Sequence, residues 1–160
     1  MRYQTWDFNS AEAQAWGERG VAVFRPHGVV CEATAPQLLD SAQDMMRDWQ
    51  IGGLLADYTH SRLAVSARGL LDHAVHTVGR GGSLAAPTAL LVPAQDAAFW
   101  RLYAGLMARQ GIVRGVFVAL APAMDWVRCQ AALHAAERGL QCPMSLPMSA
   151  PKSRICTISE

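Results

Sequence analysis

Lysine is almost missing from this chain, and neither sign of charge is in excess. Only Lys152 among the 14 basic residues is a lysine, and 13 acidic residues leave a formal net charge of +1 at pH 7. A protein that binds nucleic acid normally carries a basic patch or a clear basic excess. We therefore expect no nucleic-acid partner. We interpret the preference for arginine, together with abundant alanine, as the bias of a GC-rich bacterial genome.

Long hydrophobic runs are also lacking. The segment Met1–Asp7 has no apolar run behind its arginine, so we expect no secretory signal. The longest apolar stretches, residues 84–94 and 115–124, contain proline. They are much shorter than the roughly 20 residues that a membrane-spanning helix needs. These absences predict a cytoplasmic protein that does not insert into a membrane.

Motifs of metal binding and catalysis are missing as well. The chain has no Cys-x-x-Cys pair of the kind that is typical of zinc sites, because its four cysteines are Cys31, Cys129, Cys142 and Cys156. In a reducing cytoplasm we expect them to be free thiols. The Gly-x-Ser-x-Gly, His-Glu-x-x-His and Walker motifs do not occur. We therefore predict no metal, no cofactor and no enzymatic activity.

The chain does contain enough apolar residues to build one domain. It has 160 residues, of which 51% are hydrophobic and 17% are charged, and a typical domain has about 100–200 residues. We assign residues 1–142 to a single domain. Prolines at every fourth position of Pro143–Pro151 prevent a helix, so residues 143–160 are predicted to be an extended or disordered tail. A tail that reached across to a second copy would make a homodimer, which is a further hypothesis.

Apolar periodicity predicts that strands and helices alternate along the chain. The expected strands are Arg2–Phe8, Glu12–Trp16, Gly20–Arg25, Leu54–Tyr58, Pro87–Val92 and Ile112–Leu120. The expected helices are Ala35–Trp49, Ala64–Val78, Asp96 to about Gly111, and Pro122 to about Gly139. Parallel neighbours need helical crossovers, so this order predicts an α/β fold with a mixed, mostly parallel sheet and crossover helices. The first strands should add an antiparallel N-terminal edge.

Several local signals accompany these predictions. A turn at Asn9-Ser10 should separate the first two strands, and Pro26-His27-Gly28 should end the third. Thr34 should cap the first helix and Asp96 the third. Gly111 should end the third helix in a left-handed conformation.

Helical spacing also predicts which side chains face the core. In the first helix the apolar stripe includes Met45, Met46 and Trp49. The stripes of the second and third helices are predicted to be Ala67, Leu71, Ala74 and Val78, and Phe99, Leu102, Tyr103, Leu106 and Met107. Trp100 would then lie at a partly exposed border and, with Met107, could contact a partner or a second subunit.

Two motifs were weighed as ligand sites and assigned plainer roles. His73 and His76 are three residues apart beside Asp72, but they should point away from the core and lack a clear third metal ligand. A solvated helix face is the simpler interpretation. The segment Gly79–Ser83 follows a helix and precedes a strand, whereas a phosphate-binding loop follows a strand and opens a helix. We therefore interpret Gly79–Ser83 as a helix terminator.

Three short patterns resemble STAS-like domains related to anti-sigma-factor antagonists, over about Gly20–Gln130. Gly20–Val30 resembles the strand and the Gly-hydrophobic entry to the first helix in that family. Gly53–Asp57 resembles the central strand, and Ala123–Val127 resembles the opening of the last helix. The resemblance implies a STAS-like fold and a regulatory or protein-binding role.

The resemblance also implies a place for a phosphorylated serine. STAS-like domains carry an Asp-Ser-Ser-Gly step between the central strand and the next helix, and a serine of that step accepts phosphate. The corresponding region, 57–69, lacks the motif, although Ser61 and Ser66 lie in it. Phosphorylation of Ser61 or Ser66 is therefore a hypothesis.

The candidate site is the loop that follows the strand Leu54–Tyr58. Ligand sites in open parallel sheets gather at the carboxyl ends of the strands, where this loop should lie beside Pro93–Asp96. Its predicted binding or switch residues are Asp57, Thr59, His60, Ser61, Arg62, Ser66 and Arg68. The two arginines could pair with a phosphate on a nearby serine.

Two functions remain open for this loop. The first is a non-enzymatic regulatory or protein-interaction module with a protein partner. The second is a small-molecule-binding domain or weak hydrolase, in which Asp57 would hold His60 in a useful tautomer. Ordinary turn chemistry, with Asp57 and Thr59 bonded to backbone amides, is the plain alternative.

Overall fold

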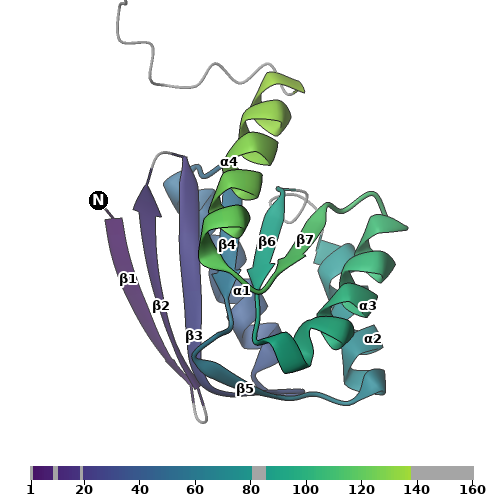
Figure 1. Ribbon diagram of the computed structural model, residues 1–160. Helices are drawn as coiled ribbons and strands as arrows, with labels where there is room; N and C mark the ends of the chain where they lie inside the picture. The colour runs from purple at the N-terminus through teal and green to yellow at the C-terminus, as the bar shows by residue number, and fades with distance from the viewer. Residues whose placement is uncertain (1, 9–10, 19, 81–85, 138–160) are drawn as a thin grey trace, which may run out of the picture.

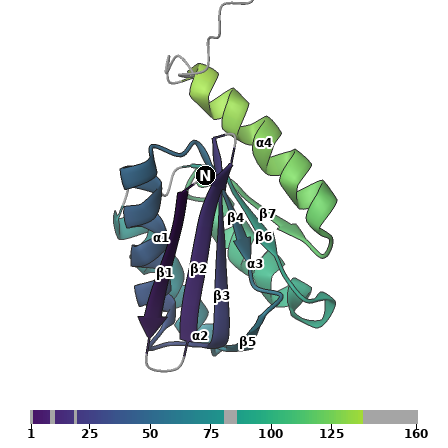
Figure 2. The same ribbon diagram turned by 90° about the vertical axis from the view of Figure 1, so that its left-hand side faces the viewer.

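A central sheet is covered by helices on both faces. The structure is a computed structural model that describes residues 2–8, 11–18, 20–80 and 86–137. In chain order the elements are β1 (Arg2–Phe8), β2 (Ala11–Glu18), β3 (Val21–Cys31), α1 (Ala35–Trp49), β4 (Gly53–Asp57), β5 (Ser61–Ala64), α2 (Ala67–Arg80), β6 (Thr88–Leu91), the short 3-10 helix η2 (Ala94–Asp96), α3 (Ala97–Ala108), β7 (Arg114–Phe117) and α4 (Leu120–Glu137). Figures 1 and 2 show α4 alone on the face opposite α1.

The strand order confirms the predicted fold class. The sheet runs β1-β2-β3-β4-β6-β7, and β5 pairs with β3 beside this path. The pairs β1–β2 and β2–β3 are antiparallel, whereas β3–β4, β3–β5, β4–β6 and β6–β7 are parallel. The result is a mostly parallel sheet with an antiparallel N-terminal edge, as the alternation of elements predicted.

Strand β4 shows why both faces need helices. Leu54 and Ala56 pack into the clusters formed with α1, α2 and α3, whereas Leu55 packs with Ala123 and Val127 of α4. Successive side chains of a strand point to opposite faces, so a strand buried on both faces reads as a continuous apolar run. This is the pattern that identified the strand in the sequence.

Strand β3 continues through the segment that was expected to end it. It extends to Cys31 and pairs with β2 through Pro26, which lies opposite Ala13. On its other side, β3 pairs with β4 up to Phe24 and with β5 from Gly28. Pro26 therefore lies where β3 changes partners, and its missing N–H breaks no ladder bond on that side. The prediction that the strand stops at Arg25 was wrong.

The long β3 also explains a strand that the sequence analysis missed. Its second half extends past the end of β4 and offers an unpaired edge. Residues Ser61–Ala64 occupy that edge as β5. The second helix consequently begins at Ala67 and not at Ala64.

Two buried positions of α2 lie one residue before the positions that were predicted. Leu70 and Thr77 are buried, whereas Leu71 and Val78 are exposed. Leu70 and Leu71 are adjacent apolar residues, as are Ala74 and Val75, so spacing alone did not select the face. The polar Thr77 is accommodated inside because its hydroxyl donates to the His73 carbonyl at 2.8 Å.

The buried face of α3 was also misassigned in part. Tyr103 and Met107 are buried as expected, but Trp100 is only 4% exposed and Leu102 is 58% exposed. Trp100 packs against Tyr58, with ring centroids 4.5 Å apart and the ring planes tilted by 31°. The predicted exposed border of Trp100 and Met107 does not exist.

Helix ends agree with the sequence only in part. Gly111 has φ +74° after α3, as expected, and Pro36 lies in the first turn of α1, where a missing N–H breaks no helical bond. Neither Thr34 nor Asp96 makes a side-chain cap bond. Thr34 instead donates its hydroxyl to the Val29 carbonyl at 3.1 Å, which ties α1 to β3.

Some predictions fall outside the described residues. These are the turn at Asn9-Ser10, most of Gly79–Ser83, Cys142, Cys156 and the tail over 143–160. Cys129 is a free thiol, and the Cys31 sulfur lies 3.6 Å from the Thr34 hydroxyl. Among the helices of the described ranges, none combines the length and the apolar character needed to cross a bilayer.

Candidate binding site at the carboxyl edge of the sheet

The carboxyl ends of β4 and β6 form a common rim, as predicted. Asp57 is the register partner of Leu91, and the Tyr58 N–H donates to the Leu91 carbonyl at 2.8 Å. The next ladder bond runs from the Val92 N–H to the Phe117 carbonyl at 2.9 Å, which extends the rim to β7. The loop after β4 and the segment that begins at Pro93 therefore lie side by side.

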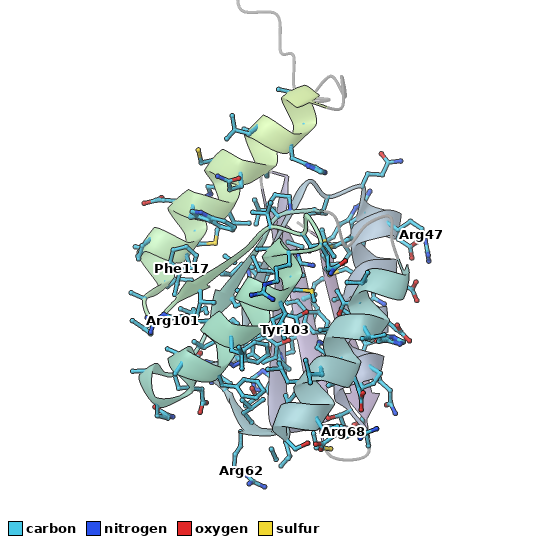
Figure 3. All side chains as sticks on the ribbon, turned by 90° about the vertical axis from the view of Figure 1, so that its right-hand side faces the viewer. Arg47, Arg62, Arg68, Arg101, Tyr103 and Phe117 are labelled. Atoms are coloured by element: carbon cyan, nitrogen blue, oxygen red, sulfur yellow. The ribbon has the colours of Figure 1, made fainter. Side chains whose placement is uncertain are left out.

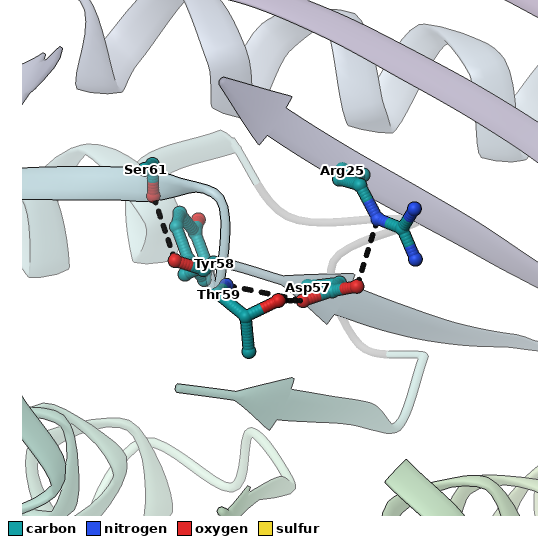
Figure 4. Close-up of polar contacts among 5 residues, drawn as sticks. All are labelled: Arg25, Asp57, Tyr58, Thr59 and Ser61. Atoms are coloured by element: carbon teal, nitrogen blue, oxygen red, sulfur yellow. Dashed lines mark hydrogen bonds and ion pairs between the residues drawn. The ribbon is translucent and has the colours of Figure 1, made fainter. Parts of the chain in front are cut away.

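Asp57 anchors the loop to the sheet. Its carboxylate is almost fully buried and accepts the Arg25 Nε–H at 2.8 Å. The other carboxylate oxygen accepts the Thr59 N–H at 3.1 Å and the Thr59 hydroxyl at 2.5 Å (Figure 4). The Arg25 guanidinium also lies 4.9 Å from the centroid of the Trp16 ring. Both carboxylate oxygens thus hold β3, β4 and the turn together.

His60 does not join Asp57. It is exposed, and its ring lies against His27 with centroids 5.4 Å apart. Asp57 and His60 are both among the described residues, and no hydrogen bond joins them. A hydrolytic role required Asp57 to pair with His60. Asp57 instead contacts Arg25 and Thr59, and the Thr59 contact is the ordinary turn chemistry that was the plain alternative.

The two candidate serines have different environments. The half-buried Ser61 donates its hydroxyl to the Tyr58 carbonyl at 3.0 Å. The exposed Ser66 stands directly before α2, and its hydroxyl accepts the Gly69 N–H at 3.0 Å. Ser66 is therefore the N-cap of α2. That position lies between the central strand and the next helix, where the family resemblance places its serine.

Glu32 belongs to this site, and the sequence analysis did not find it. Its carboxylate accepts the Ser66 N–H at 2.8 Å. Bonds from the backbone and side chain of Ser66 hold the pKa of Glu32 below its ordinary value. Glu32 is 34 positions away from Ser66, and only the pairing of β3 with β5 brings the two together. No local motif signals such a contact.

Arg62 and Arg68 surround the loop with positive charge. Both side chains are exposed and lie at the same end of the molecule (Figure 3). Arg68 has a loose contact with Asp72 at 3.8 Å. A contact of this kind between exposed groups contributes little to stability, so Arg68 can reorient toward an incoming anion.

His73 and His76 do not form the solvated pair that was expected. His76 lies 3.3 Å from an Asp40 carboxylate oxygen, whereas His73 is turned inward and stacks on Tyr103 with ring centroids 5.5 Å apart. Burial, with smaller contributions from the charges of His76 and Arg114, lowers the pKa of His73 to about 4. Within the described ranges, no three His, Cys, Asp or Glu residues are placed to hold a metal.

An apolar groove lies between α2 and α3. It has a volume of about 410 Å³ and is lined by Leu71, Ala74, Val75, Val78, Gly79, Leu106, Met107 and Gln110. Val75 is 72% exposed, and Leu102 continues the strip one turn before Leu106 on α3. We refer to Leu71, Val75, Val78, Leu102 and Leu106 as the docking face.

Comparison with known proteins identifies the fold. No family model matches the chain, and no curated protein matches its sequence. The anti-sigma factor antagonist from Mycobacterium paratuberculosis is similar in structure, with a TM-score of 0.54 and 18% sequence identity, over 74% of this chain and 95% of that one. The phosphorylated form of the Bacillus cell fate determinant SpoIIAA gives a TM-score of 0.44 and 16% identity, over 72% of this chain and 98% of that one. The chain has the STAS-like fold in a divergent form, as the resemblance implied.

Proposed function

We propose that this protein is a non-enzymatic regulatory module that binds a partner protein through its docking face. The observation that carries the proposal is the exposure of large apolar side chains on two adjacent helices. Contiguous apolar patches on a protein surface commonly mark interaction sites. Leu71, Val75 and Leu102 are 52%, 72% and 58% exposed. The groove between the helices gives the patch the concave shape that a partner's side chains can enter.

The charges around the docking face indicate the kind of partner. Arg62 and Arg68 flank it at the end that carries the loop, and Arg101 lies on α3 toward Phe117 (Figure 3). All three side chains are exposed. A complementary surface would present an apolar segment bordered by acidic residues, because complementary charge orients and accelerates association.

The fold supports the same role. A solved neighbour that shares it is named an anti-sigma factor antagonist. The Asp57 contacts with Arg25 and Thr59 use this carboxylate to fix the loop, which favours a binding surface over acid–base chemistry at this rim.

We further propose that Ser66 is the regulated residue of the module. Its hydroxyl is exposed at the N-terminus of α2, where a phosphate would be stabilised by the helix dipole. A phosphate there would also repel Glu32, which now accepts the Ser66 N–H. Phosphorylation would thus break the bond that ties the start of α2 to the end of β3, next to the docking face.

The docking face is tested with a matched pair of substitutions. Leu71→Glu places a charge on the docking face, and Leu133→Glu places one at an equally exposed leucine of α4, since the two residues are 52% and 53% exposed. Proteins captured from native extract would be identified, purified and titrated against each variant. We expect Leu71→Glu to weaken partner binding at least about tenfold, or about 1.4 kcal/mol, and Leu133→Glu to leave it unchanged.

Circular dichroism should show that both variants remain folded, because both sites are on the surface. The proposal is wrong if Leu71→Glu and Leu133→Glu bind the partner equally well. It is also wrong if both variants lose the binding of every captured protein to the same extent.

A further inference from the structure

A small cavity lies beneath the helical layer, and its lining shares Tyr58 with the loop but no residue with the docking face. Its volume is about 40 Å³. Its apolar wall is formed by side chains from β3, β4, β6, α1 and α3, including Phe24, Leu38, Leu54, Leu90 and Trp100. Its polar lining consists of Gln43, Tyr58, His73, Thr88, Tyr103 and Arg114. Figure 3 places Tyr103 near the centre of this layer.

Two polar atoms at this cavity lack a hydrogen-bond partner among the described residues. They are Nε2 of Gln43 and Nδ1 of His73. Gln43 is only 8% exposed, so water outside the protein does not satisfy its amide. Buried polar groups in folded proteins are nearly always bonded, and each exception calls for an explanation such as a bound molecule, water or ion. Both atoms therefore point to an occupant of the cavity.

The polar groups of the lining are mainly hydrogen-bond donors. The Gln43 amide nitrogen, the hydroxyls of Tyr58 and Tyr103, and the guanidinium of Arg114 all supply N–H or O–H groups. Burial raises the pKa of Tyr58, which keeps its hydroxyl protonated at neutral pH. The lining contains no aspartate or glutamate. A molecule with a negative charge and accepting oxygens suits these donors.

Several of the donors belong to one connected cluster. The Tyr103 hydroxyl is hydrogen-bonded to Arg114 and lies 3.4 Å from the Thr77 hydroxyl. The His73 ring stacks on the Tyr103 ring. Arg114 is held in place by bonds from Nη1 to the carbonyls of Ala86 and Val113, both 3.0 Å long. The cation is therefore fixed beside the cavity and gives this end a positive potential.

We propose that this cavity binds a small carboxylate with a short apolar end, of the size of acetate or propionate. The carboxylate oxygens would accept from the donor cluster, and the alkyl end would contact the apolar wall. The volume sets the size, because about 40 Å³ corresponds to roughly three water positions at about 10–15 Å³ each. The apolar wall disfavours a phosphate, whose oxygens would need polar partners on every side.

The test is a titration of the full chain with sodium propionate, followed by nitrogen–proton correlation spectra. Propionamide serves as the neutral isostere, and sodium chloride controls for ionic strength. We expect saturable shifts at Trp100 and Tyr103 and a higher melting temperature with propionate. Propionamide should bind at least about tenfold more weakly, because the charge-assisted hydrogen bonds are lost.

Matched variants on α1 complete the experiment. Gln43→Leu removes the unpartnered amide and should weaken propionate about fivefold, while the melting temperature of the ligand-free protein stays the same or rises. Gln37→Leu, at an exposed position of the same helix, should bind propionate like the wild type. Leu71→Glu should also bind propionate like the wild type. The cavity proposal and the docking-face proposal can therefore fail independently.

Three results would overturn the proposal. The first is the absence of saturable shifts, which a cavity that holds only water would give. The second is equal binding of propionate and propionamide. The third is unchanged propionate affinity in a folded Gln43→Leu variant.

Discussion

At the scale of single residues, neighbours far away in the chain determine what a side chain does. Asp57 and His60 are close in sequence, yet the Asp57 carboxylate binds Arg25 of another strand. His73 and His76 are one helical turn apart, yet only His73 is turned inward to stack on Tyr103. The same residue types would have served a hydrolase or a metal site. Their partners assign them to the scaffold and to the cavity instead.

The burial of His73 predicts a pH dependence of stability. Its pKa is about 4 in the folded protein and about 6.5 in an unfolded chain. The unfolded chain therefore binds the proton more readily between these values, and stability falls as the pH drops from about 6.5 to about 4. We expect a loss of about 2–3 kcal/mol from this residue.

The measurement is urea unfolding at pH 7 and pH 4. His73→Phe keeps a flat ring against Tyr103 but has no proton to bind, so it should lose this share of the pH dependence. His60→Gln, at an exposed histidine, should follow the wild type. If the free energy of unfolding falls by the same amount between pH 7 and pH 4 in His73→Phe and in the wild type, burial does not hold the His73 ring neutral.

At the scale of elements, the length of one strand arranges the whole site. Because β3 continues to Cys31, its second half pairs with β5, and Glu32 meets the start of α2. The Ser66 cap and the Glu32 carboxylate then satisfy backbone N–H groups on either side of the loop–helix junction. Residue spacing within one segment does not predict such pairing, because the paired segments are far apart in the sequence.

Ser66 gives a prediction at this scale that separates capping from regulation. Ser66→Ala should destabilise the protein by about 1 kcal/mol, because the Gly69 N–H loses its acceptor. Ser66→Asp retains a capping oxygen but places a carboxylate beside Glu32. We expect Ser66→Asp to weaken partner binding and Ser66→Ala to preserve it. Thermal unfolding and titration with the captured partner measure the two effects.

Mass spectrometry of the protein from its native cell checks the modification itself. Phosphate on Ser66 is the expected finding. Its absence in every growth state, or phosphate on Ser61 alone, would contradict the assignment. Ser61 then becomes the residue to substitute, since its hydroxyl donates to the Tyr58 carbonyl within the same loop.

At the scale of the whole molecule, the loop and the two proposed sites occupy different places. The loop lies at the carboxyl rim, the docking face lies on the outer side of α2 and α3, and the cavity lies on their inner side. The helix α4 packs alone on the opposite face. A homodimer joined through residues 143–160 remains a prediction about the whole molecule.

Light scattering with and without residues 143–160 tests that dimer. If the tail joins two copies, the full chain has twice the mass of one chain and the shortened chain has the mass of one. The prolines of Pro143–Pro151 predict a tail without a helix, so we expect the shortened chain to keep its melting temperature. Equal oligomeric states for both forms would remove the tail from the dimer hypothesis.

The sequence by itself determined the alternation of strands and helices apart from β5, the class of sheet and the rim where the loop lies. Continuous apolar runs and helical spacing are local properties of the chain, and each run such as Leu54–Tyr58 carried its own signal. Only the tertiary structure decided the inward face of α2, the continuation of β3 and the contact of Glu32 with Ser66. The physical reason is that burial and long-range pairing depend on which surfaces meet. A polar residue such as Thr77 is buried when its hydroxyl finds partners there, and spacing along the chain does not reveal those partners.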